Sequence, residues 1–292
     1  MRILILTDAS DRHFYFCNRI ASEADHVVGI ITGGKEINRP WTEQVKRTLT
    51  RHPLQSARQF YFKKRYRSYG RAIRVEKREA EKRFFADGAR QFTETFSELV
   101  IGPLQPSDRS INDRRFVELI RSSEPDAIVV MGTCILGSAI LKSAPVILNM
   151  HTGLSPYYRG GRTNFWPFIE NDPGYFGVTV HKMSSGIDTG DIVYSERIKV
   201  ETGDTFGSIN AKSIVAGTGL MIKALKHLRA GTMNALPQWT PGKLFHDRDW
   251  TLKAAKIYFD NREALIERQI QGETEDAFSA IVTVENGRAK NG

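Results

Sequence analysis

The sequence predicts an α/β protein built on an open, mostly parallel twisted sheet with helices on both faces. Short, β-branched apolar runs recur along the chain, and they are typical of strands that are buried on both faces. The first run (2–7, RILILT), an expected helix (11–24) and a second run (27–32, VVGIIT) have the spacing of a βαβ unit. Parallel strands need a crossover of this kind, so the unit predicts a parallel sheet.

The alternation continues beyond a basic segment. Apolar patterns predict four further strands and two further helices: strands at 126–131, 146–150, 175–183 and 191–200, and helices at 111–123 and 205–229. Residues 40–95 interrupt the pattern and predict a basic helical insertion. We expect a catalytic domain over 1–230 and a small C-terminal extension over 231–292, with the polar residues 270–292 loosely held. Ligands of such sheets bind beyond the carboxyl ends of the strands.

Composition excludes several classes of protein. The chain has 292 residues, of which 40% are hydrophobic and 26% charged, and this mixture is typical of globular rather than disordered proteins. Cys17 and Cys134 are far apart and form no CxxC motif, which favours a reducing, cytoplasmic location. No apolar run approaches the roughly 18 residues of a membrane span. The first residues predict a strand rather than a signal peptide.

Positive charge is concentrated in one segment. Residues 46–90 contain 15 Lys or Arg and 4 Asp or Glu, a net charge of +11, so the rest of the chain is −2 within the total of +9. Interleaved aromatic and basic residues can bind phosphates by charge and bases by stacking. An amphipathic helix with its apolar side turned inward explains the same pattern. A polyanion or nucleotide partner, an acidic membrane surface and a solvated helix are the alternatives for this segment.

Asn149 and His151 stand at the end of a predicted strand. The period of two puts both side chains on the same side of the strand. An amide donor and an imidazole together can stabilise the negative charge of a carbonyl oxygen under attack. No Ser or Cys stands beside a base, so the pair suits acyl transfer to an external nucleophile. The alternative is a polar strand end with a hydrogen-bonded histidine.

Asp188 lies in the turn SSGIDTGD, between glycines. A carboxylate placed there can orient a histidine or accept a proton. Gly and Asp also dominate ordinary turns, so a purely structural turn remains the alternative. Asp188 and Asp191 have no third ligand nearby, and we expect no metal site.

Several stretches together resemble one family. They are HTGLSPYYRG at 151–160, FW at 165–166, GVTVHKM at 177–183 and GIDTGDIV at 186–193. In order, type and spacing they resemble the folate-dependent formyltransferases, which include glycinamide ribonucleotide formyltransferase, methionyl-tRNA formyltransferase and the nucleotide-sugar N-formyltransferases. MGTCILG at 131–137 resembles the folate-binding loop of that family.

The resemblance implies a Rossmann-like formyltransferase fold and a reaction. A substrate amine would attack the formyl carbon of 10-formyltetrahydrofolate, with Asn149 and His151 stabilising the oxyanion and Asp188 orienting His151 and assisting proton transfer. The scheme contains no metal. The resemblance places the folate against two loops, whose expected contacts are Thr133, Cys134, Ile135, Leu136, Ser184, Gly186 and Ile187.

The acceptor amine is chosen among the substrates of the family. The purine enzyme resembles the chain less, because its first turn is glycine-rich and the turn here is TDASDR. The tRNA enzyme carries an extra C-terminal barrel that hardly fits the 104 residues after Asp188. We therefore expect a nucleotide-linked amino sugar. The expected substrate-binding residues are Ser10, Arg12, Tyr157, Tyr158, Arg159 and Arg162. Another small amine, methionyl-tRNA and a non-catalytic binding module are the alternatives, and the extension suggests a homodimer.

Overall fold

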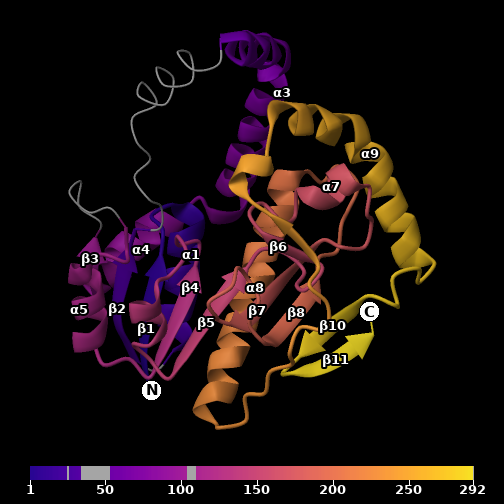
Figure 1. Cartoon of the computed structure of the whole chain (residues 1–292). Helices are drawn as coiled ribbons and strands as arrows, with labels where there is room; N and C mark the ends of the chain where they lie inside the picture. The colour runs from indigo at the N-terminus through magenta and orange to yellow at the C-terminus, as the bar shows by residue number, and fades with distance from the viewer. Residues whose placement is uncertain (25, 34–52, 104–109, 292) are drawn as a thin grey trace.

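One large sheet organises the molecule (Figure 1). The computed structural model describes residues 1–24, 26–33, 53–103 and 110–291. The strand order across the sheet is β11-β10-β8-β7-β5-β4-β1-β2-β3. The strands are β1 (Arg2–Thr7), β2 (His26–Thr32), β3 (Val100–Pro103), β4 (Ala127–Met131), β5 (Val146–His151), β7 (Gly177–Lys182), β8 (Ile192–Arg197), β10 (Val282–Glu285) and β11 (Arg288–Asn291). A second, small sheet pairs β6 (Tyr158–Gly160) with β9 (Lys243–Phe245).

The sheet has a parallel half and an antiparallel half. Strands β3, β2, β1, β4 and β5 pair in parallel, and the apolar runs of β1 and β4 are buried along their length. From β5 onward the pairing through β7, β8, β10 and β11 is antiparallel. A short turn joins β7 to β8, and such a turn can connect only antiparallel neighbours. The open sheet is confirmed, and the parallel pairing is confined to strands β1 to β5.

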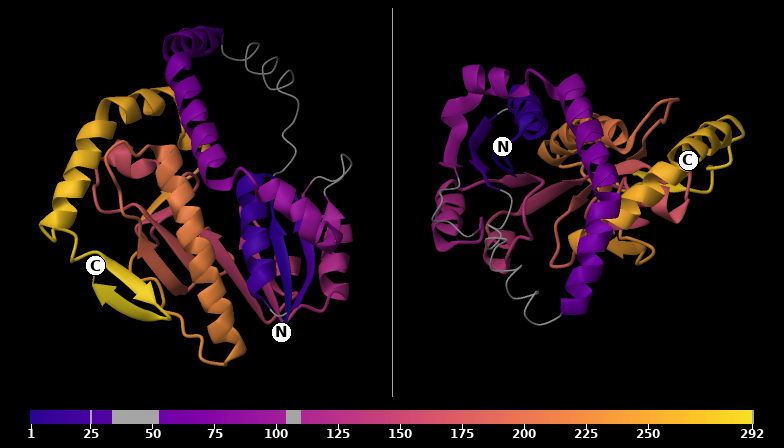
Figure 2. Two further views of the ribbon diagram at one scale, coloured as in Figure 1. Left: turned by 180° about the vertical axis from the view of Figure 1, so that it is seen from behind. Right: turned by 90° about the horizontal axis from the view of Figure 1, so that it is seen from above.

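Helices cover both faces of this sheet, as predicted (Figure 2). They are α1 (Asp11–Glu23), α3 (Pro53–Phe85), α4 (Gly88–Phe96), α5 (Arg114–Ser122), α6 (Ser138–Leu141), α7 (Trp166–Glu170), α8 (Phe206–Arg229) and α9 (Leu252–Thr274), with 3-10 turns η1 (Ser97–Leu99) and η2 (Asp247–Asp249). One apolar cluster joins α1, α8 and α9 to one face, and a smaller one joins α5 and α6 to the other. In the described ranges, none of these helices combines the length and the apolar character needed to cross a membrane.

The predicted basic insertion is largely helical where the structure describes it. Residues 40–52 lie outside the described residues, and α3 and α4 account for most of 53–95. On α3, Ile73, Ala80 and Phe85 are buried, and the ring of Tyr69 lies 5.8 Å from that of Phe259 in α9. Apart from Val75, which is 43% exposed, the large apolar side chains in the described part of α3 face the body of the protein, which is the arrangement of an amphipathic helix.

The C-terminal residues are integrated into the fold. The predicted boundary at 230/231 falls directly after α8, and residues on both sides of it contribute strands to the same sheet. The expectation that 270–292 are loosely held is wrong for the described part: β10 pairs with β8, and Val284 is 1% exposed. The segment looks polar because β10 and β11 form an edge hairpin, in which mainly one face is covered.

Candidate active site

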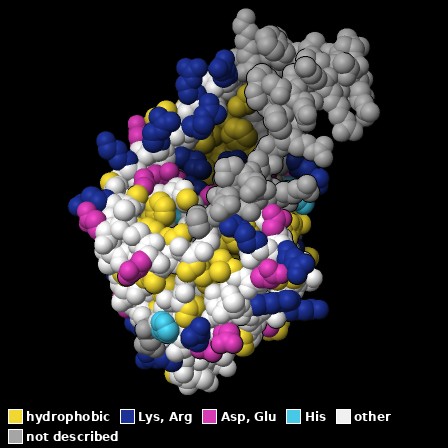
Figure 3. All heavy atoms as spheres, turned by 90° about the vertical axis from the view of Figure 1, so that its left-hand side faces the viewer, with side chains coloured by type: hydrophobic (Ala, Val, Ile, Leu, Met, Phe, Trp, Pro, Cys, Tyr) yellow, Lys and Arg dark blue, Asp and Glu magenta, His cyan; other side chains and the backbone are white. Residues whose placement is uncertain are grey.

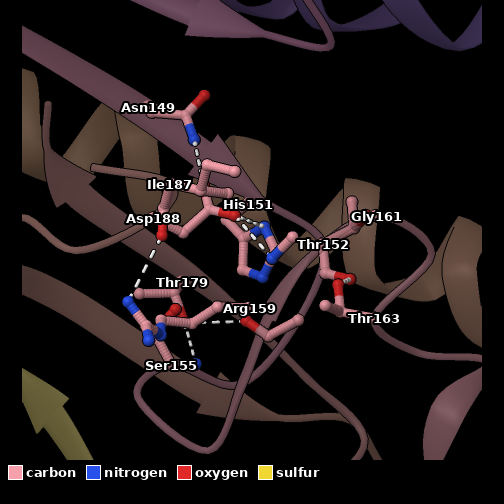
Figure 4. A network of polar contacts seen from close by, with 12 residues as sticks. Asn149, His151, Thr152, Ser155, Arg159, Gly161, Thr163, Thr179, Ile187 and Asp188 are labelled. Carbon is pink, nitrogen blue, oxygen red and sulfur yellow. Dashed lines mark hydrogen bonds and ion pairs between the residues drawn. The ribbon is translucent and has the colours of Figure 1, made fainter. Parts of the chain in front are cut away.

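The Asp188 carboxylate lies at the centre of a polar network (Figure 4). Its Oδ2 accepts a hydrogen bond from the Gly160 N–H at 2.9 Å and lies 3.3 Å from His151 Nδ1. Its Oδ1 accepts from Asn149 Nδ2 at 3.4 Å. Asn149 and His151 come from β5, and Asp188 comes from the turn after β7, at a left-handed φ of +49° that Asp tolerates better than most residues. The three predicted catalytic residues are thus in contact.

His181 is a fourth member of this network that the sequence did not single out. It lies directly opposite Asn149 in the antiparallel pairing of β5 and β7. The Lys182 carbonyl can only accept, so His181 Nδ1 carries the proton of the 2.8 Å hydrogen bond between them. Nε2 of a neutral ring is then a lone pair, and it accepts from Asn149 Nδ2 at 3.1 Å. His181 therefore fixes the orientation of the Asn149 amide.

The His151 imidazole is enclosed by protein. Its Nε2 donates to the Tyr158 carbonyl at 3.0 Å, and only 6% of the residue is exposed. Burial lowers the pKa of His151, the Asp188 charge opposes this, and the net shift is downward. We infer that the ring is neutral at pH 7, with its single proton on Nε2. Nδ1 is then a basic lone pair facing a carboxylate.

Asp188 carries the negative charge of the site. Burial raises the pKa of its carboxyl. At the acidic pH where a carboxyl titrates, the protonated imidazoles of His151 and His181, together with the Gly160 N–H, outweigh burial and hold the pKa below its ordinary value. The carboxylate is therefore ionised over the physiological pH range. Within the part of the chain that the structure describes, no three His, Cys, Asp or Glu side chains gather in a way that could hold a metal ion.

Two glycines let the loop after β5 fold over the catalytic group. A Cβ at Gly153 would lie 2.6 Å from His151 Nε2 and would overlap the Thr163 hydroxyl. Gly160 has a φ of +93°, and a Cβ there would overlap the Phe245 carbonyl oxygen of β9. Both positions therefore require glycine for close approach.

Residues after 230 also support the site. Gln238 Nε2 donates to the Asp188 carbonyl at 2.7 Å and to the Gly190 carbonyl at 2.9 Å, which closes the catalytic turn. Strand β9 pairs with β6 and so holds the segment whose Gly160 N–H reaches Asp188. No local sequence pattern predicts these contacts, because the partners lie 48 or more residues apart in the sequence.

The loop expected to bind folate follows β4, beside the end of β5. Its residues are Thr133, Cys134, Ile135 and Leu136. Asn112 brackets the loop: its Nδ2 donates to the Ile135 carbonyl at 2.9 Å, and its Oδ1 accepts from the Gly137 N–H at 2.6 Å. Ile135 is 70% exposed, whereas the Leu136 side chain is buried in the core. For Leu136, only the backbone is available to a ligand.

The second expected folate segment is the turn between β7 and β8. Ser184 Oγ and Thr189 Oγ1 are 2.7 Å apart and close the turn around Gly186. The Ile187 carbonyl points to Arg159 Nη1 at 3.4 Å (Figure 4). The turn and the 133–136 loop both adjoin Asn149, through β7 and β4 respectively. The folate contacts of both segments remain predictions.

Some of the expected substrate-binding side chains are buried or already paired in the structure, and others are available to a ligand. The Tyr158 side chain is 1% exposed and stacks on Phe245, while its hydroxyl donates to Asp172 at 2.5 Å. The expectation that the Tyr158 side chain binds the substrate is therefore wrong, because packing leaves none of its ring available. Tyr157 is half-buried, and its hydroxyl accepts from the Val282 N–H at 3.0 Å.

Three of the remaining substrate candidates are already engaged. Arg12 forms an ion pair with Glu81 of α3, and Ser10 Oγ lies 2.8 Å from His13 Nδ1 at the start of α1. Arg162 lies 3.5 Å from an Asp247 oxygen. These side chains do not reach toward the Asp188 network as free phosphate ligands.

Arg159 is the candidate that the structure brings to the site. Apart from the long contact to the Ile187 carbonyl, its guanidinium has no protein partner among the described residues, and its Nε is buried and unpaired there. Trp239, which the sequence did not single out, is 41% exposed and follows Gln238. Both residues lie next to the turn between β7 and β8 that carries Asp188.

Residues 71–225, just over half of the chain, match the family model described as formyl transferase. The chain belongs to the formyl transferase family. Its curated relatives include the methionyl-tRNA formyltransferase of Lachnospira eligens, 34% identical over 175 residues, which cover 58% of this chain and 53% of the relative. The same enzyme of Desulforamulus reducens is 34% identical over 144 residues, covering 49% and 44%. This formyl transferase chain spans about half the length of the curated relatives that it matches.

Solved structures share the fold. A 4-N formyltransferase from Francisella tularensis superposes with a TM-score of 0.55 at 15% identity, covering 89% of this chain and 86% of that one. Glycinamide ribonucleotide transformylase 1 from Symbiobacterium toebii gives 0.52 at 16% identity, covering 79% and 88%. At these identities the likeness shows that the formyl transferase fold is common to them.

Proposed function

We propose that this chain transfers a formyl group from 10-formyltetrahydrofolate to a primary amine, and that a nucleotide-linked amino sugar carries the amine. Formyl transfer is supported by the contact of Asn149 and His151 with one carboxylate in a member of the formyl transferase family. Asn149 Nδ2 and His151 Nδ1 lie 3.4 Å and 3.3 Å from the Asp188 oxygens. The acceptor is argued separately below.

In the proposed reaction the amine nitrogen attacks the formyl carbon. A new C–N bond forms, the bond from that carbon to the folate nitrogen breaks, and one proton moves from the amine to the folate nitrogen. Asn149 Nδ2 holds one N–H against His181 at 3.1 Å, whereas its other N–H reaches Asp188 only at 3.4 Å. That second N–H is the donor available to a developing oxyanion.

Asp188 and His151 provide a temporary place for the proton. The resting pair consists of a carboxylate and a neutral ring whose Nδ1 lies 3.3 Å from Oδ2. A proton that arrives between these atoms gives an imidazolium that donates to Asp188 through Nδ1 and to the Tyr158 carbonyl through Nε2. Both donors of the charged ring are then satisfied, and the proton can pass on to the leaving nitrogen.

The nucleotide part of the proposal depends on Arg159 and Trp239. A guanidinium without an acidic partner matches the oxygens of a diphosphate, and an exposed indole can stack on a base or a sugar ring. Arg12 and Arg162 give no support, because each is paired with a carboxylate. A second candidate acceptor is methionyl-tRNA, which is favoured by the 34% identity to methionyl-tRNA formyltransferases.

The test is an assay of formyl transfer to a panel of acceptors, in which the release of tetrahydrofolate is measured. Nucleoside diphosphate amino sugars should be formylated, and a free nucleoside diphosphate should compete with the acceptor but not with the folate. Turnover of glycinamide ribonucleotide or methionyl-tRNA, without competition by nucleotides, would refute the sugar and leave formyl transfer intact. A chain that binds folate and turns over none of these amines would be a binding module.

Variants test the catalytic assignment in the same assay. Asn149→Ala, His151→Ala and Asp188→Ala should each lower kcat by about a hundredfold or more, the scale of losing one oxyanion donor. The matched control is His26→Ala, which removes an exposed histidine at the start of β2. A near-normal kcat at any of the three positions would remove that residue from the mechanism.

A further inference from the structure

Five basic side chains form a single row along α3. Counting from the first, they are spaced by four, three, four and four residues, and all are exposed: Arg67, Arg71, Arg74, Arg78 and Lys82. At 3.6 residues per turn they fall within about 80° of the helix circumference, over a length of about 22 Å. We name these five residues the α3 cation row.

The charge of the row is not neutralised by the protein. None of its members forms an ion pair with another residue that the structure describes. The acidic residues of α3 are mostly directed elsewhere: Glu76 bonds to Tyr258 and Arg262, and Glu81 bonds to Arg12. Like charges one turn apart on a helix repel each other. The row therefore costs stability, and an anionic partner would relieve that cost.

The opposite side of α3 is already occupied. Ile73 and Ala80 are buried, Tyr69 packs against Phe259, and the helix contacts α8 and α9. Figures 1 and 2 show α3 at the outside of the molecule, with these helices to one side of it. In Figure 3, a group of Lys and Arg side chains lies along the upper left edge, and others are spread over the lower part of the face. The row thus offers charge from an outermost helix whose opposite side, in the described part, is already packed against the protein.

We propose that the α3 cation row docks the protein on a membrane surface rich in anionic phospholipid. A straight row on an outermost helix meets a plane along its whole length, so all five cations contact headgroup phosphates at once. A helix in a nucleic-acid groove has a phosphate backbone on each flank. One flank of this row carries Val75, 43% exposed, and the exposed carboxylate of Glu79, neither of which binds phosphate. The packed ring of Tyr69 offers no base a stacking surface.

Docking of this kind is electrostatic and superficial. In the described part of α3, Ile73, Ala80 and Phe85 are buried and cannot enter the lipid, so the cations of the row supply most of the binding there. Each cation near an anionic surface strengthens binding by about fivefold. Salt at about 1 M reduces the Debye length to about 3 Å and should abolish the interaction.

The experiment is co-sedimentation of the full chain with vesicles and requires no acceptor amine. Vesicles of phosphatidylcholine with roughly one third phosphatidylglycerol should bind the protein at low salt, and pure phosphatidylcholine should not. A row variant removes four charges: Arg67→Gln, Arg71→Gln, Arg74→Gln and Arg78→Gln. A matched variant removes four exposed charges elsewhere: Arg121→Gln, Lys142→Gln, Lys199→Gln and Lys223→Gln.

The row variant should bind anionic vesicles several-hundredfold more weakly, at about fivefold per charge, and the matched variant should stay within about tenfold of the wild type. Thermal unfolding checks that both fold. If the row variant does not, the pair Arg71→Gln/Arg74→Gln should still give a loss of about 25-fold. Three results would overturn the proposal: no binding of the wild type to anionic vesicles, equal losses in the row and matched variants, or row-dependent binding of duplex RNA or DNA without vesicle binding.

Discussion

Replacing Gly160 by Ala should separate β6, which borders the active site, from β9, the strand that supports it. The backbone φ of Gly160 is +93°, and an added Cβ would overlap the carbonyl oxygen of Phe245 in β9. The left-handed region costs a non-glycine residue about 1–2 kcal/mol. Relieving the overlap requires β6 and β9 to separate, which sacrifices hydrogen bonds such as Gly161 N–H to the Phe245 carbonyl at 2.8 Å. Two such bonds are worth about 2 kcal/mol together, so the total loss should be about 3–4 kcal/mol.

Gly203→Ala is the matched control, because it shares the backbone cost without the overlap. Its φ is +84°, and nothing lies within 4 Å of an added Cβ. Calorimetric or fluorescence-detected melting should therefore give a Tm for Gly160→Ala about 4–8 °C below that of the control, at about 2–4 °C per kcal/mol. Formyl transfer should fall only in Gly160→Ala, since the Gly160 N–H is a donor to Asp188. Equal Tm losses in the two variants would refute the reasoning.

Two further predictions concern the histidine and the folate loop. Burial holds the pKa of His151 below its ordinary value near 6.5, so as the pH falls below about 6.5 the unfolded chain takes up a proton that the folded chain does not, and stability drops. Urea unfolding at pH 7.5 and 5.5 should show the stability of the wild type relative to His151→Gln falling by about 1 kcal/mol, and a pH-independent difference would contradict this. Asn112→Ala removes two hydrogen bonds from the 133–137 loop and should weaken folate binding by about 25-fold with kcat nearly unchanged, at about 1 kcal/mol for each bond. An unchanged folate dissociation constant in a fluorescence titration would disconnect that loop from the folate.

Local patterns predicted most of the strands and helices before residue 230, but not β3, α9, β10 or β11, and they placed two of the three catalytic residues together. The buried strands β1, β4 and β5 are continuous apolar runs, and α8 begins at Phe206, one residue from its predicted start. Asn149 and His151 share a strand, so the period of two was enough to place them together. Their contact with Asp188 was predicted only through the family resemblance, because a turn carboxylate 39 residues away has no periodic relation to them.

The sequence by itself determined where most strands and helices of residues 1–230 form and which residue types stand at the carboxyl ends of the strands. The tertiary structure decided which of those residues are available to a ligand. Arg12 and Arg162 look like phosphate ligands in the sequence, but packing brings Glu81 and Asp247 against them, whereas Arg159 is left without an acidic partner among the described residues. His181 gained its position from the register of β5 against β7. The physical reason is that periodicity reports only which side of an element a residue faces, while partners, burial and pKa depend on atoms brought close from distant parts of the chain.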